Sequence, residues 1–189
     1  MFNLSWSRRK VLKGALFGAA FLLRGLPALA ETAGYGTLPE GRLSFYNIHS
    51  RERLAVTYRD LFGNYDAAAM EAINNILRCR YTGKSASMDV QVIEYLNLID
   101  KNLGGGNDIH VVSGYRSPEL NALLGRESRG VAKSSLHTKG RAIDIMIPGI
   151  ATDTLREYAY SLACGGVGYY PREGFVHIDS GGFRIWSGS

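Results

Sequence analysis

An aspartate in the middle of an apolar segment constrains the fold of this chain more than any other feature. Residues 141–147 alternate like a β-strand, and Asp144 stands there between Ile143 and Ile145. Burying a lone carboxylate is costly unless something pairs with it. Ala142 lies on the same strand face, because side chains alternate, and its small side chain leaves room beside the carboxylate. The fold must therefore bring a partner to Asp144, and a metal ion would satisfy that need.

Two of the four histidines stand in settings that suit such a site. His137 comes at the end of a polar loop predicted over 125–136, directly before the strand that carries Asp144. His177 lies in a short apolar strand, and Asp179 follows two residues later on the same face. Two histidines and one carboxylate match an open zinc site, because catalytic zinc takes three protein ligands and keeps a fourth position for water.

The first 30 residues have the order of a cleavable export signal. A twin-arginine segment at 7–13 precedes an apolar stretch at 15–23 and a small-x-small site at 28–30. The apolar stretch is shorter than the roughly 20 residues that a membrane span needs. We therefore expect residues 1–30 to be a twin-arginine signal peptide that is cleaved, in preference to an uncleaved anchor. After cleavage we expect no stable membrane span and a periplasmic location.

Removal of residues 1–30 leaves 159 residues, enough for one domain with a core. We expect residues 31–40 to be a flexible lead-in and 41–189 to form that single domain. The signal holds five basic residues and no acidic ones, so the rest of the chain has 17 Lys and Arg against 17 Asp and Glu. This balance gives no argument for nucleic-acid binding, and no feature of the sequence predicts the oligomeric state.

The two cysteines leave a choice open. Neither Cys79 nor Cys164 has the spacing of a metal ligand. The periplasm permits a disulfide, but both residues also fit the pattern of small buried hydrophobic side chains.

The helix and strand patterns predict an α+β domain with an antiparallel sheet and helices packed on one side. Most strands come late in the chain, which is typical of that class. The predicted helices are 67–77, one from Ser87 or Asp89 to 104, one from Ser117, and 152–164; the predicted strands are 42–48, 54–58, 109–113, 141–147, 166–170, 175–178 and 183–186.

Several separated motifs resemble one known family. The string S-x-H-x-x-G-x-A-x-D at 135–144, followed by a histidine in a late strand, resembles the zinc D-alanyl-D-alanine peptidases and murein endopeptidases of the Hedgehog/D-Ala-D-Ala-peptidase fold. SGYRSP at 113–118, GVGYYP at 166–171 and FVHID at 175–179 are similar to its YcbK-like (MepK) branch. The resemblance covers about residues 40–187, and the order of the motifs makes it specific.

The resemblance implies a zinc-dependent murein endopeptidase that hydrolyses cross-links between peptidoglycan stem peptides. It implies Zn²⁺ on His137, Asp144 and His177. It also implies that Arg116 binds the substrate carbonyl or the developing oxyanion, a role that suits a fixed guanidinium. The alternative is that Arg116 caps a turn or pairs with a nearby acid.

The general base stays open. Many relatives carry a glutamate three residues before the last histidine or a histidine two before it, but Gly174 and Phe175 occupy those positions here. Asp179 is the first candidate, because it shares a strand face with His177, and Glu173 is the second. Asp179 fits equally well as a partner that orients a metal-bound imidazole.

Two other functions also stay open. A D,D-carboxypeptidase that trims terminal D-alanine would need a positive charge for the free carboxylate, from Arg116 or Arg184. A non-catalytic wall-binding module would keep the zinc and lack a base.

The remaining polar and aromatic residues are given supporting roles. We expect Ser135 to support the site, because no triad pattern surrounds it. His110 is expected to be structural and His49 exposed near a hairpin turn. Tyr169, Tyr170 and Trp186 fit either a substrate groove or ordinary packing.

Overall fold

The computed structural model describes residues 39–127 and 135–188. The predicted export signal, most of the lead-in and the centre of the polar loop lie outside these residues. No helix in the described ranges is long and apolar enough to cross a membrane.

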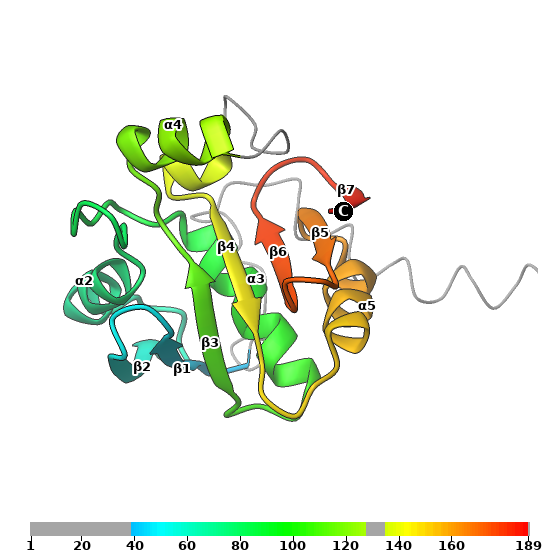
Figure 1. Ribbon diagram of the computed structural model, residues 1–189. Helices are drawn as coiled ribbons and strands as arrows, with labels where there is room; N and C mark the ends of the chain where they lie inside the picture. Colours follow the sequence, from blue (N-terminus) through cyan, green and yellow to red (C-terminus); the bar gives the residue numbers. More distant parts are fainter. Residues whose placement is uncertain (1–38, 128–134, 189) are drawn as a thin grey trace, which may run out of the picture. The chain divides into compact units, whose positions relative to one another are not determined.

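A seven-stranded mixed sheet forms the centre of the domain, in the order β2-β1-β3-β4-β6-β5-β7 (Figure 1). The strands are β1 Gly41–Asn47, β2 Arg53–Arg59, β3 Asp108–Ser113, β4 Ala142–Met146, β5 Gly166–Tyr170, β6 Phe175–Asp179 and β7 Arg184–Ser187. The α+β class is confirmed. Four neighbouring pairs are antiparallel, while β1/β3 and β5/β7 are parallel, because the intervening elements return the chain in its original direction.

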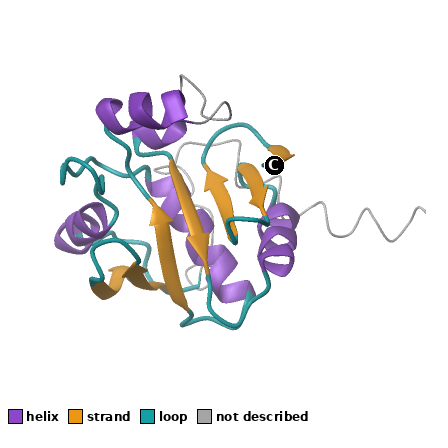
Figure 2. Cartoon of the chain, viewed as in Figure 1, coloured by secondary structure: helices purple, strands orange, loops and turns teal. Residues whose placement is uncertain are grey.

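Four α-helices accompany the sheet in the described ranges: α2 Ala67–Ile76, α3 Val90–Asn102, α4 Pro118–Glu127 and α5 Thr152–Leu162. Helix α3 contacts β1 and β6, and α5 contacts β5 and β6, so together they cover one face of the sheet (Figure 2). Helix α4 lies at the edge of the sheet where β3 ends and β4 begins (Figure 1).

Side chains at the predicted helix starts cap the helices. Asp66 accepts a hydrogen bond from the backbone N–H of Ala69, and Asp89 accepts one from Gln91. The hydroxyl of Ser117 accepts one from the N–H of Leu120. Helix α4 continues to Glu127, so the prediction that a loop begins at residue 125 is wrong for its first three residues.

The two faces of the sheet differ in chemistry because side chains alternate along each strand. On the face beneath the helices, the apolar side chains form a buried core; they include Leu43, Phe45, Ile109, Val111, Ile143, Ile145, Val176 and Ile178. The opposite face carries Asp144, His177 and Asp179, which the strand register brings together. The predicted site therefore lies on the sheet face opposite α3 and α5.

The two cysteines are free: Cys79 is buried and Cys164 is half-buried.

Candidate metal centre

Strand pairing brings the first two predicted ligands together. Asp144 on β4 is the direct cross-strand neighbour of His177 on β6, and Ala142 is the neighbour of Asp179. Side chains in such pairs lie on the same face with Cβ atoms about 5 Å apart. Nδ1 of His177 is 2.8 Å from Oδ1 of Asp144. Ala142 is buried on the same strand face as Asp144.

The third predicted ligand, His137, comes from a short 3₁₀ turn, η1 Leu136–Lys139, directly before β4. Gly140 ends this turn with a φ of 65°, a left-handed conformation that favours glycine. Nδ1 of His137 lies 2.7 Å from the carbonyl oxygen of Gly114. Its other ring nitrogen, Nε2, is therefore directed at the pair on the sheet, 3.2 Å from Oδ1 of Asp144 and 3.1 Å from Nδ1 of His177.

The hydrogen bonds around the two imidazoles determine which ring atoms carry protons. A carbonyl oxygen only accepts, so Nδ1 of His137 donates to Gly114. Nε2 of His177 lies 2.9 Å from the carboxylate of Asp179 and donates to it. In neutral rings the remaining nitrogens are lone-pair donors, and both face the carboxylate of Asp144. Nε2 of His137, Nδ1 of His177 and Oδ1 of Asp144 thus converge on one point. Either a proton on Nδ1 of His177 or a metal ion among the three atoms would satisfy the charge of Asp144.

The geometry of the three residues fits a metal ion. One ligand atom from each of His137, Asp144 and His177 lies within 4.8 Å of the others, and all three residues are buried. Two imidazole nitrogens and one carboxylate oxygen form a ligand set found in catalytic zinc sites, which leave a position open. Such rings are usually held by a hydrogen bond on the other nitrogen, as both are here.

Burial and charge act on the three ligands in different directions. Burial lowers the pKa of His137 below its ordinary value, which favours the neutral, metal-binding ring. Burial also disfavours the charged form of His177, but its hydrogen bonds to Asp144 and Asp179 outweigh burial and raise its pKa. For Asp144, burial opposes ionisation, yet the two histidines hold the pKa well below its usual range. The carboxylate is therefore ionised and available as a ligand.

Asp179 lies behind His177, on the side away from Asp144. Its side chain is fully buried. Oδ1 accepts hydrogen bonds from the backbone N–H groups of Gly181 at 2.8 Å and Gly166 at 3.2 Å. Arg184 contacts both oxygens, at 3.0 Å and 2.6 Å. Together with His177, these contacts occupy both oxygens of the carboxylate.

Glu173, the other predicted base, lies in the turn between β5 and β6. Its side chain is exposed. It forms no hydrogen bond or ion pair with any described residue. The structure therefore does not bring it to the three ligands.

Arg116 lies beside the ligands. Its Nη2 donates to Oδ2 of Asp144, and its Nε donates to the hydroxyl of Ser113 at 2.8 Å. Its backbone N–H donates to the carbonyl of His137. Nη1 makes no hydrogen bond within the described ranges, and the side chain is 16% exposed. Arg116 does pair with a nearby acid, as one alternative held, and it keeps one donor group available beside the ligands.

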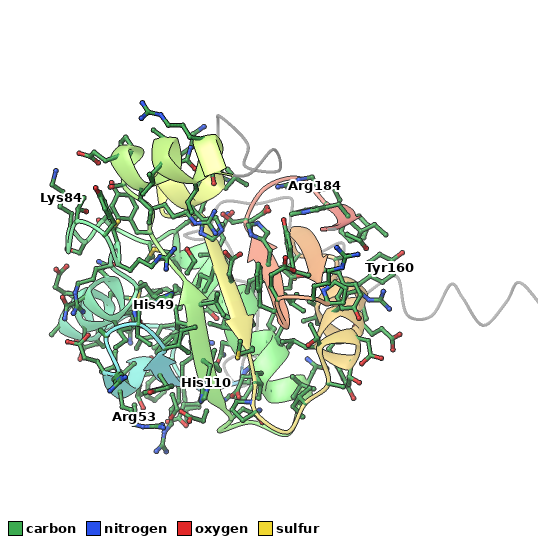
Figure 3. The ribbon with its side chains drawn as sticks, in the orientation of Figure 1. His49, Arg53, Lys84, His110, Tyr160 and Arg184 are labelled. Carbon is green, nitrogen blue, oxygen red and sulfur yellow. The ribbon has the colours of Figure 1, made fainter. Side chains whose placement is uncertain are left out.

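The other predicted residues are distributed around the fold. His49 lies in the β1–β2 turn and contacts the carbonyl of Val112, and His110 contacts Asp108. Both histidines lie apart from Arg184 in Figure 3. Ser135 is buried and its carbonyl accepts two bonds from Thr138, which holds the start of η1.

Two aromatic residues pack at the edge of the site. The ring centroid of Trp186 is 5.2 Å from that of His177. Its Nε1 donates to the hydroxyl of Tyr170 at 3.0 Å. Of the two roles left open for Trp186, packing against a ligand is the one that the contacts support.

The sequence patterns missed the partner of Asp179. The sequence suggests Arg184 only as a binding site for a substrate carboxylate. In the structure Arg184 pairs with Asp179, and four residues separate the two in the chain. One signal was available: a strand aspartate next to a metal-binding histidine needs a cation of its own, and Arg184 is the first one that follows it.

Comparisons with known proteins agree with the motifs. A family model described as peptidoglycan L,D-endopeptidase MepK matches residues 37–186. The peptidoglycan L,D-endopeptidase MepK of Escherichia coli K12 is 38% identical over 185 residues, 95% of this chain and 97% of that protein. A probable peptidoglycan L,D-endopeptidase MepK of Haemophilus influenzae is 37% identical over 179 residues, 94% of this chain and 92% of that protein.

Proposed function

Since this chain belongs to the peptidoglycan L,D-endopeptidase MepK family, we propose that it is a zinc-dependent hydrolase that cuts L,D peptide cross-links in peptidoglycan. The observation that carries the metal is the convergence of two imidazole nitrogens on the carboxylate of Asp144, with one ligand atom from each residue within 4.8 Å of the others. His137, Asp144 and His177 would hold the ion. When bound, zinc at such a site supplies an acidified water and polarises the carbonyl that is attacked.

Arg116 has the position to stabilise negative charge on the substrate. Its bonds to Asp144 and Ser113 fix the guanidinium, so no reorganisation is needed when charge develops. Nη1, which has no hydrogen-bond partner among residues 39–127 and 135–188, supplies the donor. The scissile carbonyl would lie between the three ligands and this amino group, and its oxygen would accept a hydrogen bond from Arg116 as it becomes negative.

Asp179 orients His177 and is not the general base. A base must reach the reacting water, but this carboxylate contacts the far side of the imidazole and is enclosed by Arg184 and two backbone N–H groups. Its negative charge fixes the ring tautomer that presents Nδ1 to the site. Of the two roles that the sequence leaves open for Asp179, these contacts favour the orienting partner.

The export signal completes the proposal. A twin-arginine signal over residues 1–30 would deliver the folded domain to the periplasm, where peptidoglycan is accessible. The signal pathway carries folded proteins, which suits a chain that takes up its metal before export.

The two rival functions have less support. A carboxypeptidase needs a cation for the terminal carboxylate, but the charges of both candidates are already paired: Arg184 with Asp179 and Arg116 with Asp144. A non-catalytic binding module has no need of a guanidinium held beside the candidate ligands, as that of Arg116 is by Asp144 and Ser113.

Digestion of purified sacculi tests the proposal. Residues 31–189 are incubated with sacculi, with zinc or with a chelator, and the muropeptides are identified by mass spectrometry. Zinc-dependent loss of L,D cross-linked dimers is expected. Loss of a single alanine would indicate a carboxypeptidase, and binding of zinc-loaded protein to sacculi without any product would indicate a binding module.

A further inference from the structure

We propose that Arg184, on the C-terminal strand β7, is a positioning residue of the metal centre: it fixes Asp179, which in turn fixes the imidazole of His177. This inference rests on the proposed function, because it concerns the same three ligands. It adds a part of the chain that lies outside the motif strings and assigns a role to the last strand of the sheet.

The contacts form a continuous chain from solvent to ligand. Nη1 of Arg184 lies 3.0 Å from Oδ1 of Asp179, and Nη2 lies 2.6 Å from Oδ2. This two-pronged pairing fixes the plane of the carboxylate as well as its position. The same Oδ2 accepts the proton of Nε2 of His177 at 2.9 Å. The orientation of the carboxylate therefore determines the direction of the ring and of its ligand nitrogen.

Burial makes this pairing necessary. The side chain of Asp179 has no exposed surface, whereas that of Arg184 is 46% exposed. A buried carboxylate needs a partner for its charge, and the two backbone N–H groups that it binds carry no charge. Arg184 reaches in from the edge of the sheet, since β7 pairs only with β5 (Figure 3).

Glycines on both sides leave room for the ion pair. A Cβ atom on Gly166 would collide with Oδ2 of Asp179 and come within 2.6 Å of Nη1 of Arg184. A Cβ atom on Gly181 would lie 2.8 Å from Oδ1 and 2.9 Å from Nη1. All of these distances are shorter than van der Waals contact. The ion pair between Asp179 and Arg184 therefore fits only because Gly166 and Gly181 have no side chain.

Strand β7 also supports the other side of the ligand. The guanidinium of Arg184 lies 4.9 Å above the ring of Trp186, and Trp186 packs against His177. Gly168 is the direct neighbour of Trp186 in the β5/β7 pairing, and a Cβ atom there would lie 2.7 Å from the indole. Two side chains of β7 thus act on the His177 ring: Arg184 through the hydrogen bond from Asp179, and Trp186 through a tilted ring contact with an interplanar angle of 56°.

Zinc affinity separates a positioning role from simple structural support. Arg184→Met removes the charge, Arg184→Lys keeps the charge but not the two-pronged pairing, and Arg172→Met is the control, since Arg172 is exposed in the β5–β6 turn. Each full-length mature protein is titrated with zinc against a competing chelator. The visible spectrum of the cobalt-substituted form and the melting temperature of the metal-free form are recorded beside it.

We expect the zinc affinity of Arg184→Met to fall by about 10- to 100-fold, as when other partners of metal ligands are removed. Arg184→Lys should lose less and regain part of the wild-type cobalt spectrum, and Arg172→Met should match wild type. Wild-type affinity and an unchanged cobalt spectrum in Arg184→Met would overturn the inference, even with a lower melting temperature. If Arg184→Met does not fold, a wild-type zinc affinity and a wild-type cobalt spectrum for Arg184→Lys would also overturn the inference.

The outcome for the wild-type protein separates this inference from the proposed function. A wild-type protein that binds no zinc would overturn both. A wild-type protein that binds zinc and cuts sacculi, together with unaffected Arg184 variants, would overturn the inference alone.

Discussion

Nε2 of His177 lies 2.9 Å from Oδ2 of Asp179, a residue two positions later on the same strand. The contact turns Nδ1 of the ring toward Asp144, 2.8 Å away. The aspartate that the sequence offers as either base or orienting partner thus bonds one ring nitrogen of His177, while Asp144 lies at the other.

Replacing Asp179 with asparagine tests this assignment. Asp179→Asn keeps the size of the side chain but removes the charge that holds the His177 tautomer, so we expect zinc affinity to fall by about 10- to 100-fold. Hydrolysis should largely return at saturating zinc. Zinc affinity is measured by chelator competition and hydrolysis by product release. Unchanged zinc affinity with abolished hydrolysis would instead identify Asp179 as the base.

The exposed glutamate gives the complementary test. Because Glu173 forms no hydrogen bond or ion pair with any described residue and lies in an exposed turn, Glu173→Gln should leave both kcat and zinc affinity at wild-type values. A large loss of kcat with intact zinc binding would show that Glu173 reaches the substrate.

Arg116 should affect turnover more than substrate binding. Arg116→Lys keeps a positive charge but loses the planar group that bonds Asp144 and Ser113 while presenting a third donor. We expect kcat to fall by about 10²- to 10³-fold, the usual cost of losing an oxyanion donor. A rise in KM at constant kcat would assign Arg116 to ground-state binding.

A buried ion pair away from the site should affect stability without affecting chemistry. Arg59 and Glu94 are 2.7 Å apart, with side chains 1% and 12% exposed. Removing one partner leaves an uncompensated buried charge, so Glu94→Ala should lower the free energy of unfolding by about 3–5 kcal/mol. Turnover well below the melting temperature should be unchanged.

The surface pair of Arg53 and Asp108 provides the matched control. Arg53 is 63% exposed, and Arg53→Met should cost at most about 1 kcal/mol, because exposed pairs contribute little. Equal losses in chemical denaturation of the two variants would contradict the role of burial.

The metal-free protein should lose stability in acid. Burial raises the pKa of Asp179, but bonds from His177, Arg184 and Gly181 outweigh it and hold the pKa below its ordinary value. A carboxyl group with a depressed folded pKa stabilises the fold above its unfolded pKa, near pH 4, and loses this contribution as pH falls toward the folded pKa.

Melting temperatures of chelator-treated protein should therefore fall from about pH 5 to pH 3. The fall should be shallower for Asp179→Asn, since an amide has no proton to gain. Identical slopes for the two proteins would show that Asp179 does not carry this part of the acid response.

Local features of the fold could be predicted from the sequence because their causes are local. The caps at Asp66, Asp89 and Ser117 each act within three residues, and the predicted helices begin there. The parallel pairing of β1 with β3 could not be predicted, because about 60 residues separate the two strands. Their order depends on how α2 and α3 pack in three dimensions.

The candidate site divides in the same way. Asp144 stood out because a carboxylate inside an apolar strand needs a cation, and the two histidines followed from the residues around them. The register that pairs Asp144 with His177 depends on the β4–β6 contact. The 3₁₀ turn at His137 and the arginine that holds Asp179 were missed, because both follow from how separate segments pack against each other.

The most direct test of the account is metal titration of a protein stripped by a chelator and assayed on L,D cross-linked muropeptides. The account predicts no product without metal, full activity at one equivalent of zinc per chain, and no recovery for a His137→Ala variant at that ratio. Cross-link hydrolysis by stripped wild-type protein, at the rate of the zinc-loaded enzyme, would contradict it.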